Sequence, residues 1–245
     1  MANVVRKWRR IMAQGCSHGH HANRKILNQI LKFKGTWKPD ISVELGDLVD
    51  TTPYRTGASI AELASDPAID LMAGVRWIEQ YEPTHIAWGN HDWRVQELMS
   101  SPNAILTDSA KNFWGKLQGA ARAAGARTVP YDFEKGWHEI GGTAWGHGYW
   151  YGEHAVRDTA EFLGMPTVMA HLHYAHEAQG RTRAYTKSFC TGTGADIPAL
   201  HYARRRRATS RWSHGFVFGE VCKNESKLWL VSCEPGGELR VPFTI

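Results

Sequence analysis

The sequence predicts an α/β fold built in layers, with a C-terminal part that is mostly β, and two observations support this. Up to about residue 173, short apolar stretches are followed by polar clusters and then by helical patterns, and this order recurs about five times. Strands that alternate with helices favour layered α/β architectures. After residue 173, alternating residues and β-formers lie between Gly and Pro turns, which indicates further strands.

The elements can be assigned in order along the chain. Residues 9–14 and 41–45 are expected to be strands, the second because apolar and polar residues alternate in it. Residues 22–34 are expected to be a helix, since its apolar residues fall at helical spacing. Residues 59–65 and 69–80 are expected to be helical, with a break between them at Pro67. The other helices expected are residues 93–100, 110–124 and 154–163. The other strands expected are residues 84–88, 143–145, 167–170, 187–190, 215–221, 227–232 and 239–243.

Length and composition indicate what general kind of protein this is. The 245 residues fit one domain spanning 1–245. There is no apolar run of 18 residues and no signal-peptide pattern at the N-terminus, so a cytoplasmic protein without a membrane partner is expected. Four scattered cysteines do not suit a disulfide framework. The net charge of +5 is compatible with a polyanionic partner, and the 13 histidines draw attention to metal binding.

Potential metal ligands follow the expected strands, at the ends where α/β sheets bind ligands. Thiol, imidazole, carboxylate and amide groups all occur there, which is more than one metal ion needs. Two divalent ions about 3.5–4 Å apart can clamp a phosphoryl oxygen and convert a water into a nucleophile near neutral pH. The residues in these clusters are Cys16, His18, Asp47, Asp50, Asn90, His91, Asp92, His147, His171 and His173.

The ordered set of motifs resembles the signature of the calcineurin-like metallophosphoesterases. That signature reads D-x-H, G-D-x-x-D, G-N-H-[DE], a lone His and G-H-x-H. The matching blocks here are CSH at 16–18, GDLVD at 46–50, GNHD at 89–92, His147 and AHLH at 170–173. The resemblance implies a four-layer α/β/β/α sandwich. Two positions depart from the signature: Ala170 replaces a Gly, and Cys16 replaces the first Asp.

The resemblance also implies the role of each residue. Asp47 would bridge two metal ions. The other implied ligands are Cys16, His18 and His173 at the first site and Asn90, His147 and His171 at the second. His91 would face the phosphate as a general acid, and Asp92 would orient it by accepting a hydrogen bond. Asp50 is expected outside the ligand set, as are His20 and His21.

Cys16 leaves two interpretations open. As a thiolate ligand it would favour Zn²⁺ or Fe²⁺ over Mg²⁺ and Mn²⁺, because sulfur is a softer donor than a carboxylate. Alternatively it is a buried cysteine that has left the ligand set and weakened the first site. The ligand interpretation is preferred, since the other ligands are all present. The expected cofactors are two divalent transition-metal ions: Fe, Zn or Mn.

The function expected is a phosphoesterase that hydrolyses a phosphate ester with a hydroxide bridging two metal ions. A phosphodiester substrate is preferred because of the pI near 9.0, the aromatics near the motifs and the frequent diesterase activity of the family. One alternative is a phosphomonoesterase that acts on a nucleotide or a phosphoprotein. Another is a catalytically silent module that binds metal or nucleic acid.

Two further groups of residues allow a functional or a structural interpretation. Trp93, Trp145, Trp150 and Tyr149 could form a stacking wall for a nucleobase or aryl group, but core packing is preferred. A run of arginines could bind nucleic acid, although such runs more often form solvated loops. This run consists of Arg204, Arg205, Arg206 and Arg207, with Arg211 close by.

Overall fold

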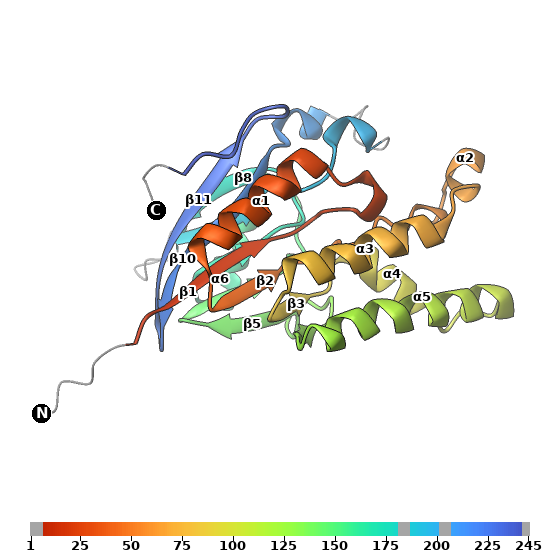
Figure 1. The fold of residues 1–245 in the computed structure, drawn as a ribbon, viewed down its shortest axis with the longest axis horizontal. Helices are drawn as coiled ribbons and strands as arrows, with labels where there is room; N and C mark the ends of the chain where they lie inside the picture. Colours follow the sequence, from red (N-terminus) through yellow and green to blue (C-terminus); the bar gives the residue numbers. More distant parts are fainter. Residues whose placement is uncertain (1–6, 181–186, 201–206, 242–245) are drawn as a thin grey trace, which may run out of the picture.

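A computed structural model describes residues 7–180, 187–200 and 207–241 and shows two β-sheets packed between two layers of helices (Figure 1). The first sheet has the strand order β11-β10-β1-β2-β3-β4, and the second has the order β5-β6-β7-β9-β8. One hydrophobic core lies between the sheets, and further cores lie beneath the helices on either side. The predicted four-layer α/β/β/α sandwich is therefore confirmed.

The first sheet aligns the ends of three strands that precede the motifs. Strands β1, β2, β3 and β4 are parallel, and β10 runs antiparallel to β1. The carboxyl ends of β1, β2 and β3 therefore meet at one edge of the sheet. The strands of this sheet are β1 (Arg9–Gln14), β2 (Ile41–Glu44), β3 (His85–Ala87), β4 (Arg127–Val129), β10 (His214–Cys222) and β11 (Glu225–Cys233).

The second sheet contributes the other two strand ends. Strands β6, β7 and β9 are parallel, whereas the edge strands β5 and β8 are antiparallel to their neighbours. His147 follows β6, and His171 and His173 follow β7. The strands of this sheet are β5 (Trp137–Ile140), β6 (Thr143–Gly146), β7 (Thr167–Met169), β8 (Ala175–Gln179) and β9 (Lys187–Thr191).

Helices α1 (Arg24–Trp37), α3 (Pro67–Tyr81) and α5 (Ala104–Ala123) cover the first sheet, and α6 (Ala155–Leu163) packs on the second (Figure 1). Side-chain oxygens of Asn23, Asp66 and Asn103 accept backbone N–H groups at the starts of α1, α3 and α5. Helices α2 (Ile60–Leu63) and α3 are separate, which confirms the predicted break at Pro67. Pro67 is the first residue of α3, a position where the missing N–H of proline costs no helical hydrogen bond. The other short elements are α4 (Asn90–Leu98), η1 (Gly19–His21), η2 (Thr52–Tyr54), η3 (Ile197–Ala199) and η5 (Arg207–Arg211).

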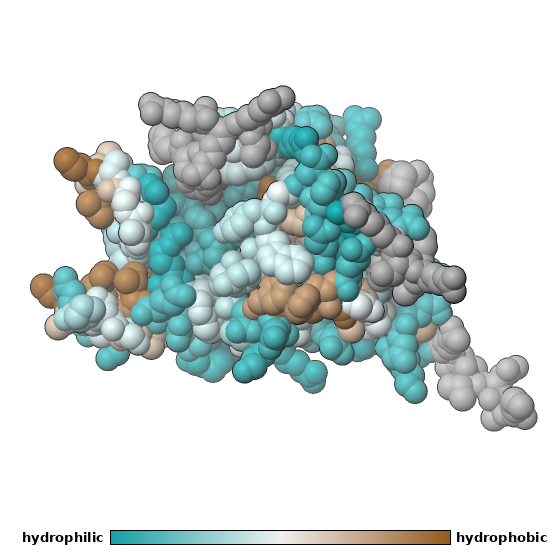
Figure 2. Space-filling view, turned by 180° about the vertical axis from the view of Figure 1, so that it is seen from behind, coloured by the Kyte–Doolittle hydropathy of each residue, from teal (hydrophilic) through white to brown (hydrophobic). Residues whose placement is uncertain are grey.

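Alternation along β1 divides its side chains between two cores. Met12 packs with the helices on the outer face, whereas Ile11 and Ala13 face the second sheet. Both faces of this strand are covered, as expected for a parallel strand in the middle of a layered fold. Exposed apolar side chains gather instead at the tips of α2 and α5 (Figure 2), where Ile60 is 88% and Ile105 is 83% exposed.

Most of the expected elements are present, with three omissions and one error. Strands β4, β5 and β8 were not expected from the sequence. The predicted strand at 239–243 is wrong over 239–241, which has no regular structure, and its last two residues lie outside the described ranges. None of the helices in the described ranges is long and apolar enough to cross a membrane.

Candidate metal centre

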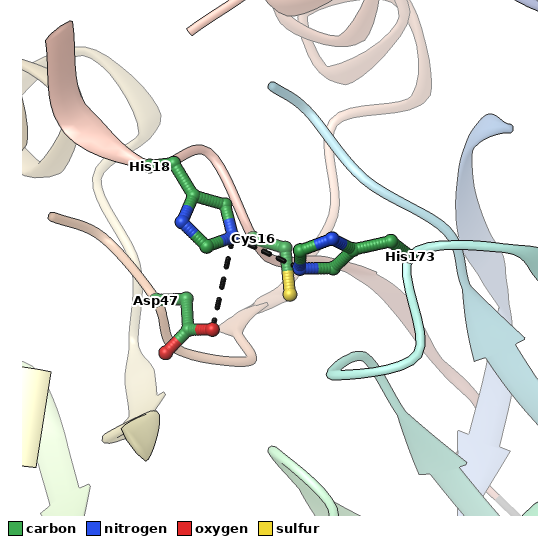
Figure 3. Close-up of side chains that lie close together, drawn as sticks. All are labelled: Cys16, His18, Asp47 and His173. Carbon is green, nitrogen blue, oxygen red and sulfur yellow. Dashed lines mark hydrogen bonds and ion pairs between the residues drawn. The ribbon is translucent and has the colours of Figure 1, made fainter. Parts of the chain in front are cut away.

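The first donor cluster joins residues from three loops. Cys16 and His18 follow β1, Asp47 follows β2, and His173 follows β7. One donor atom from each of these four buried residues lies within 4.8 Å of all the others. Nε2 of His18 is 2.9 Å from Nε2 of His173 and 3.7 Å from Oδ2 of Asp47. Figure 3 shows the four side chains pointing toward one another.

The second cluster shares Asp47 with the first. His147 Nε2 lies 3.4 Å from Asp47 Oδ2, and donor atoms of Asp47, His147 and His171 lie within 4.8 Å of one another. Asn90 Oδ1 is 3.1 Å from both His147 Nε2 and His171 Nδ1. The structure thus brings together all seven residues predicted as metal ligands, in two groups of four that have one carboxylate in common.

The backbone at these clusters adopts an uncommon conformation. Five of the eight non-glycine residues with positive φ in the described ranges belong to the clusters, with φ between 53° and 61°. A left-handed conformation costs a non-glycine residue roughly 1–2 kcal/mol. Such strain concentrates where a fold holds side chains for function. The five residues are Cys16, His18, Asp47, His171 and His173.

Two motif glycines allow the loops after β2 and β3 to touch. Gly46 has φ of +87°, and a Cβ there would overlap the backbone of Gly89. A Cβ at Gly89 would in turn overlap the Asp47 carboxylate. Glycine is needed at both positions because the two backbones approach so closely. The glycines of the G-D and G-N motifs therefore fix where Asp47 stands.

Hydrogen bonds made by Nδ1 of two histidines, His18 and His147, orient the Nε2 atoms of their rings toward the clusters. His18 Nδ1 donates to Asp50 Oδ1 at 2.9 Å, and His147 Nδ1 donates to the Leu45 carbonyl at 2.6 Å. Each bond leaves the Nε2 lone pair facing the cluster, which is the arrangement of a metal-binding histidine. Asp50 thus orients His18, and with His18 and His91 it also forms a third group of potential metal donors.

The predicted partnership of His91 and Asp92 is wrong. The Asp92 carboxylate accepts backbone N–H groups of Asp47 at 2.8 Å, Gly89 at 2.9 Å and Val49 at 3.2 Å. The ring of His91 donates from Nδ1 to the Asp50 carbonyl at 2.7 Å and lies 3.4 Å from Asp50 Oδ1. Adjacent residues at the start of a helix point in different directions, so Asp92 braces the loop while Asp50 orients His91.

Burial and neighbouring charges set the protonation of the clusters. Burial opposes ionisation of Asp47, but the imidazoles of His147 and His91 hold its pKa well below its usual range. Burial also disfavours the imidazolium of His91, yet Asp47 and Asp50 raise its pKa to about 9. Burial and the nearby His147 lower the pKa of His171 to about 3, so the ring is neutral and one nitrogen lone pair is available to a cation.

These donors fit transition-metal ions. The first group offers two imidazole nitrogens, a sulfur and a carboxylate, and the second offers two imidazoles, an amide oxygen and the same carboxylate. Four donors of these types are what zinc and related ions take. Burial, followed by the Asp47 charge, raises the pKa of the Cys16 thiol. A bound cation reverses this, since coordination deprotonates a thiol. The backbone N–H of His171 donates a hydrogen bond to Cys16 Sγ at 3.2 Å.

A cavity of about 860 Å³ opens above both clusters. Its lining includes Asp47, Asn90, His91, His171 and His173 from the clusters and their surroundings. The sequence did not reveal its aromatic lining, because these residues follow no periodic pattern and lie far from one another in the chain. The aromatic residues are Tyr151, Tyr174 and Trp212.

The four aromatics singled out from the sequence do not line this cavity. Trp145 is fully buried between the sheets, and Trp93 and Trp150 pack against cores. Tyr149 stacks on Tyr131 with ring centroids 4.9 Å apart. Core packing is thus the better interpretation for the three tryptophans, as preferred from the sequence.

The remaining predicted residues lie around the clusters or outside the described ranges. His20 contacts Asp70 at 3.0 Å and, like His21, belongs to neither ligand group. The arginine run at 204–207 falls outside the described residues, except for the backbone of Arg207 in η5. Arg211 is exposed at the cavity rim, with Nη1 3.8 Å from Glu153 Oε1.

Comparison with solved structures gives distant likenesses. One structure, with a TM-score of 0.51 and 10% identity, matches over 91% of this chain and 98% of its own, which shows a shared fold. A phosphatase from Mycoplasma pneumoniae is 11% identical with a TM-score of 0.46, over 95% of this chain and 96% of that one. A dimetal phosphatase from Danio rerio is 9% identical with a TM-score of 0.41, over 89% and 98%. A search of curated proteins found no match.

A family model decides the classification. The model for calcineurin-like phosphoesterases matches residues 9–175, which is more than half of the chain. The matched segment includes both donor clusters, from Cys16 to His173. The chain therefore belongs to the calcineurin-like phosphoesterases, a family of metal-dependent hydrolases of phosphate esters.

Proposed function

We propose that the protein is a phosphodiesterase that works with two divalent metal ions. Cys16, His18 and His173 would hold one ion, and the second group would hold the other, with Asp47 between them. The observation that carries the proposal is the pair of four-donor groups that share Asp47 beneath one cavity. When bound, such ions neutralise phosphate oxygens and activate a water molecule.

His91 is placed to protonate the leaving group. Its ring lines the cavity, and its backbone N–H donates to Asp47 Oδ1 at 2.9 Å. The Asp50 carbonyl fixes the ring through Nδ1. A general acid needs a fixed position near the reacting atoms, and Asp50 acts here as its positioning residue.

The size of the cavity supports a diester rather than a monoester. A phosphate group alone would leave most of the 860 Å³ empty, whereas cavities of this size enclose ligands as large as a drug molecule. A phosphodiester carries two substituents that can occupy the remaining volume. The basic pI of about 9.0 is in keeping with an anionic substrate.

The variant His91→Ala tests the proposal. We expect kcat on an aryl phosphodiester to fall about 10²- to 10⁴-fold while metal content stays unchanged, because proton transfer is lost and no ligand is removed. His154→Ala is the control, since His154 is exposed and lies outside the cavity lining. Faster turnover of aryl phosphomonoesters than of diesters would indicate a phosphomonoesterase. No turnover in the metal-loaded wild type would indicate a silent binding module.

A further inference from the structure

We infer that the cavity recognises a nucleoside phosphodiester by stacking its base on Tyr151 or Trp212, an inference that rests on the proposed phosphodiesterase function. These two residues, the aromatic walls, come from segments far apart in the chain. Tyr151 lies on the loop after β6, and Trp212 follows η5. Both line the cavity above the clusters.

One aromatic wall adjoins each metal-ligand group. The ring centroid of Tyr151 lies 4.5 Å from that of His171, in the second group. The ring centroid of Trp212 lies 4.3 Å from that of His173, in the first group. A phosphate bound in the cavity between the two groups would therefore have an aromatic surface near either of its ester substituents.

The two walls differ in how they are supported. Tyr151 is 74% exposed, whereas tyrosine is on average intermediate in burial. Trp212 packs against Ala195 and Leu200, which anchors it at the cavity. An exposed aromatic side chain beside the donor clusters offers a face on which a planar group can stack.

The described part of the cavity rim carries one pair of opposite charges. Arg211 lies 3.8 Å from Glu153, so the two opposite charges offset each other. Apart from histidines, Arg211 is the one cationic residue in the described lining of the cavity. A nucleobase is recognised by aromatic faces and by polar groups at its edges. Glu153 and Ser210 supply such polar groups.

A pair of substrates with one leaving group tests the stacking. Thymidine 5′-(p-nitrophenyl phosphate) and ethyl p-nitrophenyl phosphate share the leaving group and differ in the other ester substituent, which is a nucleoside in the first and an ethyl group in the second. We expect the wild type to prefer the nucleoside diester about tenfold or more in kcat/KM, and Tyr151→Leu to reduce that preference to about threefold or less. Tyr149→Leu is the matched control, because Tyr149 is a partly exposed tyrosine of the same loop outside the cavity lining.

A binding measurement separates this inference from the proposed activity. Calorimetry on the metal-loaded protein compares thymidine 5′-monophosphate with ethyl phosphate. Tighter binding of the nucleotide by about tenfold, lost in Tyr151→Leu or Trp212→Leu, supports the stacking even if no diester is hydrolysed, and then only the phosphodiesterase proposal fails. Equal affinity of the wild type for both ligands overturns the stacking, whatever the turnover.

Discussion

At the scale of single residues, Cys16 gives this centre its particular chemistry. It stands where the family motif has an aspartate, and its sulfur lies in the first donor group with His18, Asp47 and His173. The side chain is fully buried and accepts the backbone N–H of His171. A thiolate in this position would favour soft or borderline ions such as Zn²⁺ and Fe²⁺ over Mn²⁺ and Mg²⁺.

The variant Cys16→Asp is expected to shift metal preference. When the protein is reconstituted with equal amounts of Zn²⁺ and Mn²⁺, the ratio of bound Zn to Mn should fall about tenfold relative to wild type, because a carboxylate replaces the soft donor. Elemental mass spectrometry measures the ratio. Cys190→Ser is the control, since Cys190 is equally buried but lies on β9 outside the donor groups. An unchanged ratio in Cys16→Asp would mean that the sulfur is not a ligand.

The sequence predicted which residues gather at the centre better than it predicted what each one contacts. Motifs at the ends of parallel strands identify their neighbours, because the topology of the sheet brings those ends together. Side-chain direction within a motif is decided by the local backbone. His91 and Asp92 are adjacent in the sequence, yet one lines the cavity and the other binds three backbone N–H groups. Tyr151 and Trp212 carried no motif at all.

At the scale of elements, β1 and β2 carry a buried polar pair. Gln14 and Glu44 are opposite each other in the register, and Gln14 Nε2 donates to Glu44. Trp77 of α3 donates its Nε1–H to Glu44 Oε2 at 2.8 Å. Oε1 of Gln14 and Oε1 of Glu44, by contrast, have no hydrogen-bond partner. Burial raises the pKa of Glu44 well above its usual value, despite these two donors.

The variant Glu44→Gln is therefore expected to stabilise the protein near neutral pH. An acid whose pKa is raised on folding contributes stability below its unfolded pKa of about 4.3 and loses that stability as pH rises toward its folded pKa. Neutralising such a carboxyl at pH 7 costs up to about 3–4 kcal/mol, which an amide avoids. Denaturant unfolding at several pH values measures the effect. A stability difference between variant and wild type that does not grow from pH 5 to pH 7 would contradict this account.

Two of the strands that were not predicted from the sequence, β4 and β8, form because they pair with neighbouring strands, and their own residues show no strand-like alternation. Strand β8 has the sequence AHEAQ and lies at a sheet edge without a single buried residue. Strand β4 has three residues, of which two are exposed. Neither shows an alternation of buried and exposed residues that periodicity could detect. The segment 239–241 shows the opposite error: it was predicted to be a strand, but its apolar residues pack against the core without pairing in a sheet.

At the scale of the whole molecule, the centre lies where the two sheets meet. The first sheet supplies Cys16, His18, Asp47 and Asn90, and the second supplies the three remaining histidines. Each donor group contains residues from both sheets. Bound ions would therefore connect the two halves of the sandwich and stabilise the folded state by mass action.

The central claim is that two metal ions form a working centre that includes Cys16. The most direct test is to purify the protein without oxygen, measure bound metals by elemental mass spectrometry and assay the same sample on an aryl phosphodiester. We predict about two equivalents of Fe or Zn per chain, together with diester turnover. One equivalent or none, with no turnover after Mn, Fe or Zn is added, would contradict the claim and mark Cys16 as the sign of a lost first site.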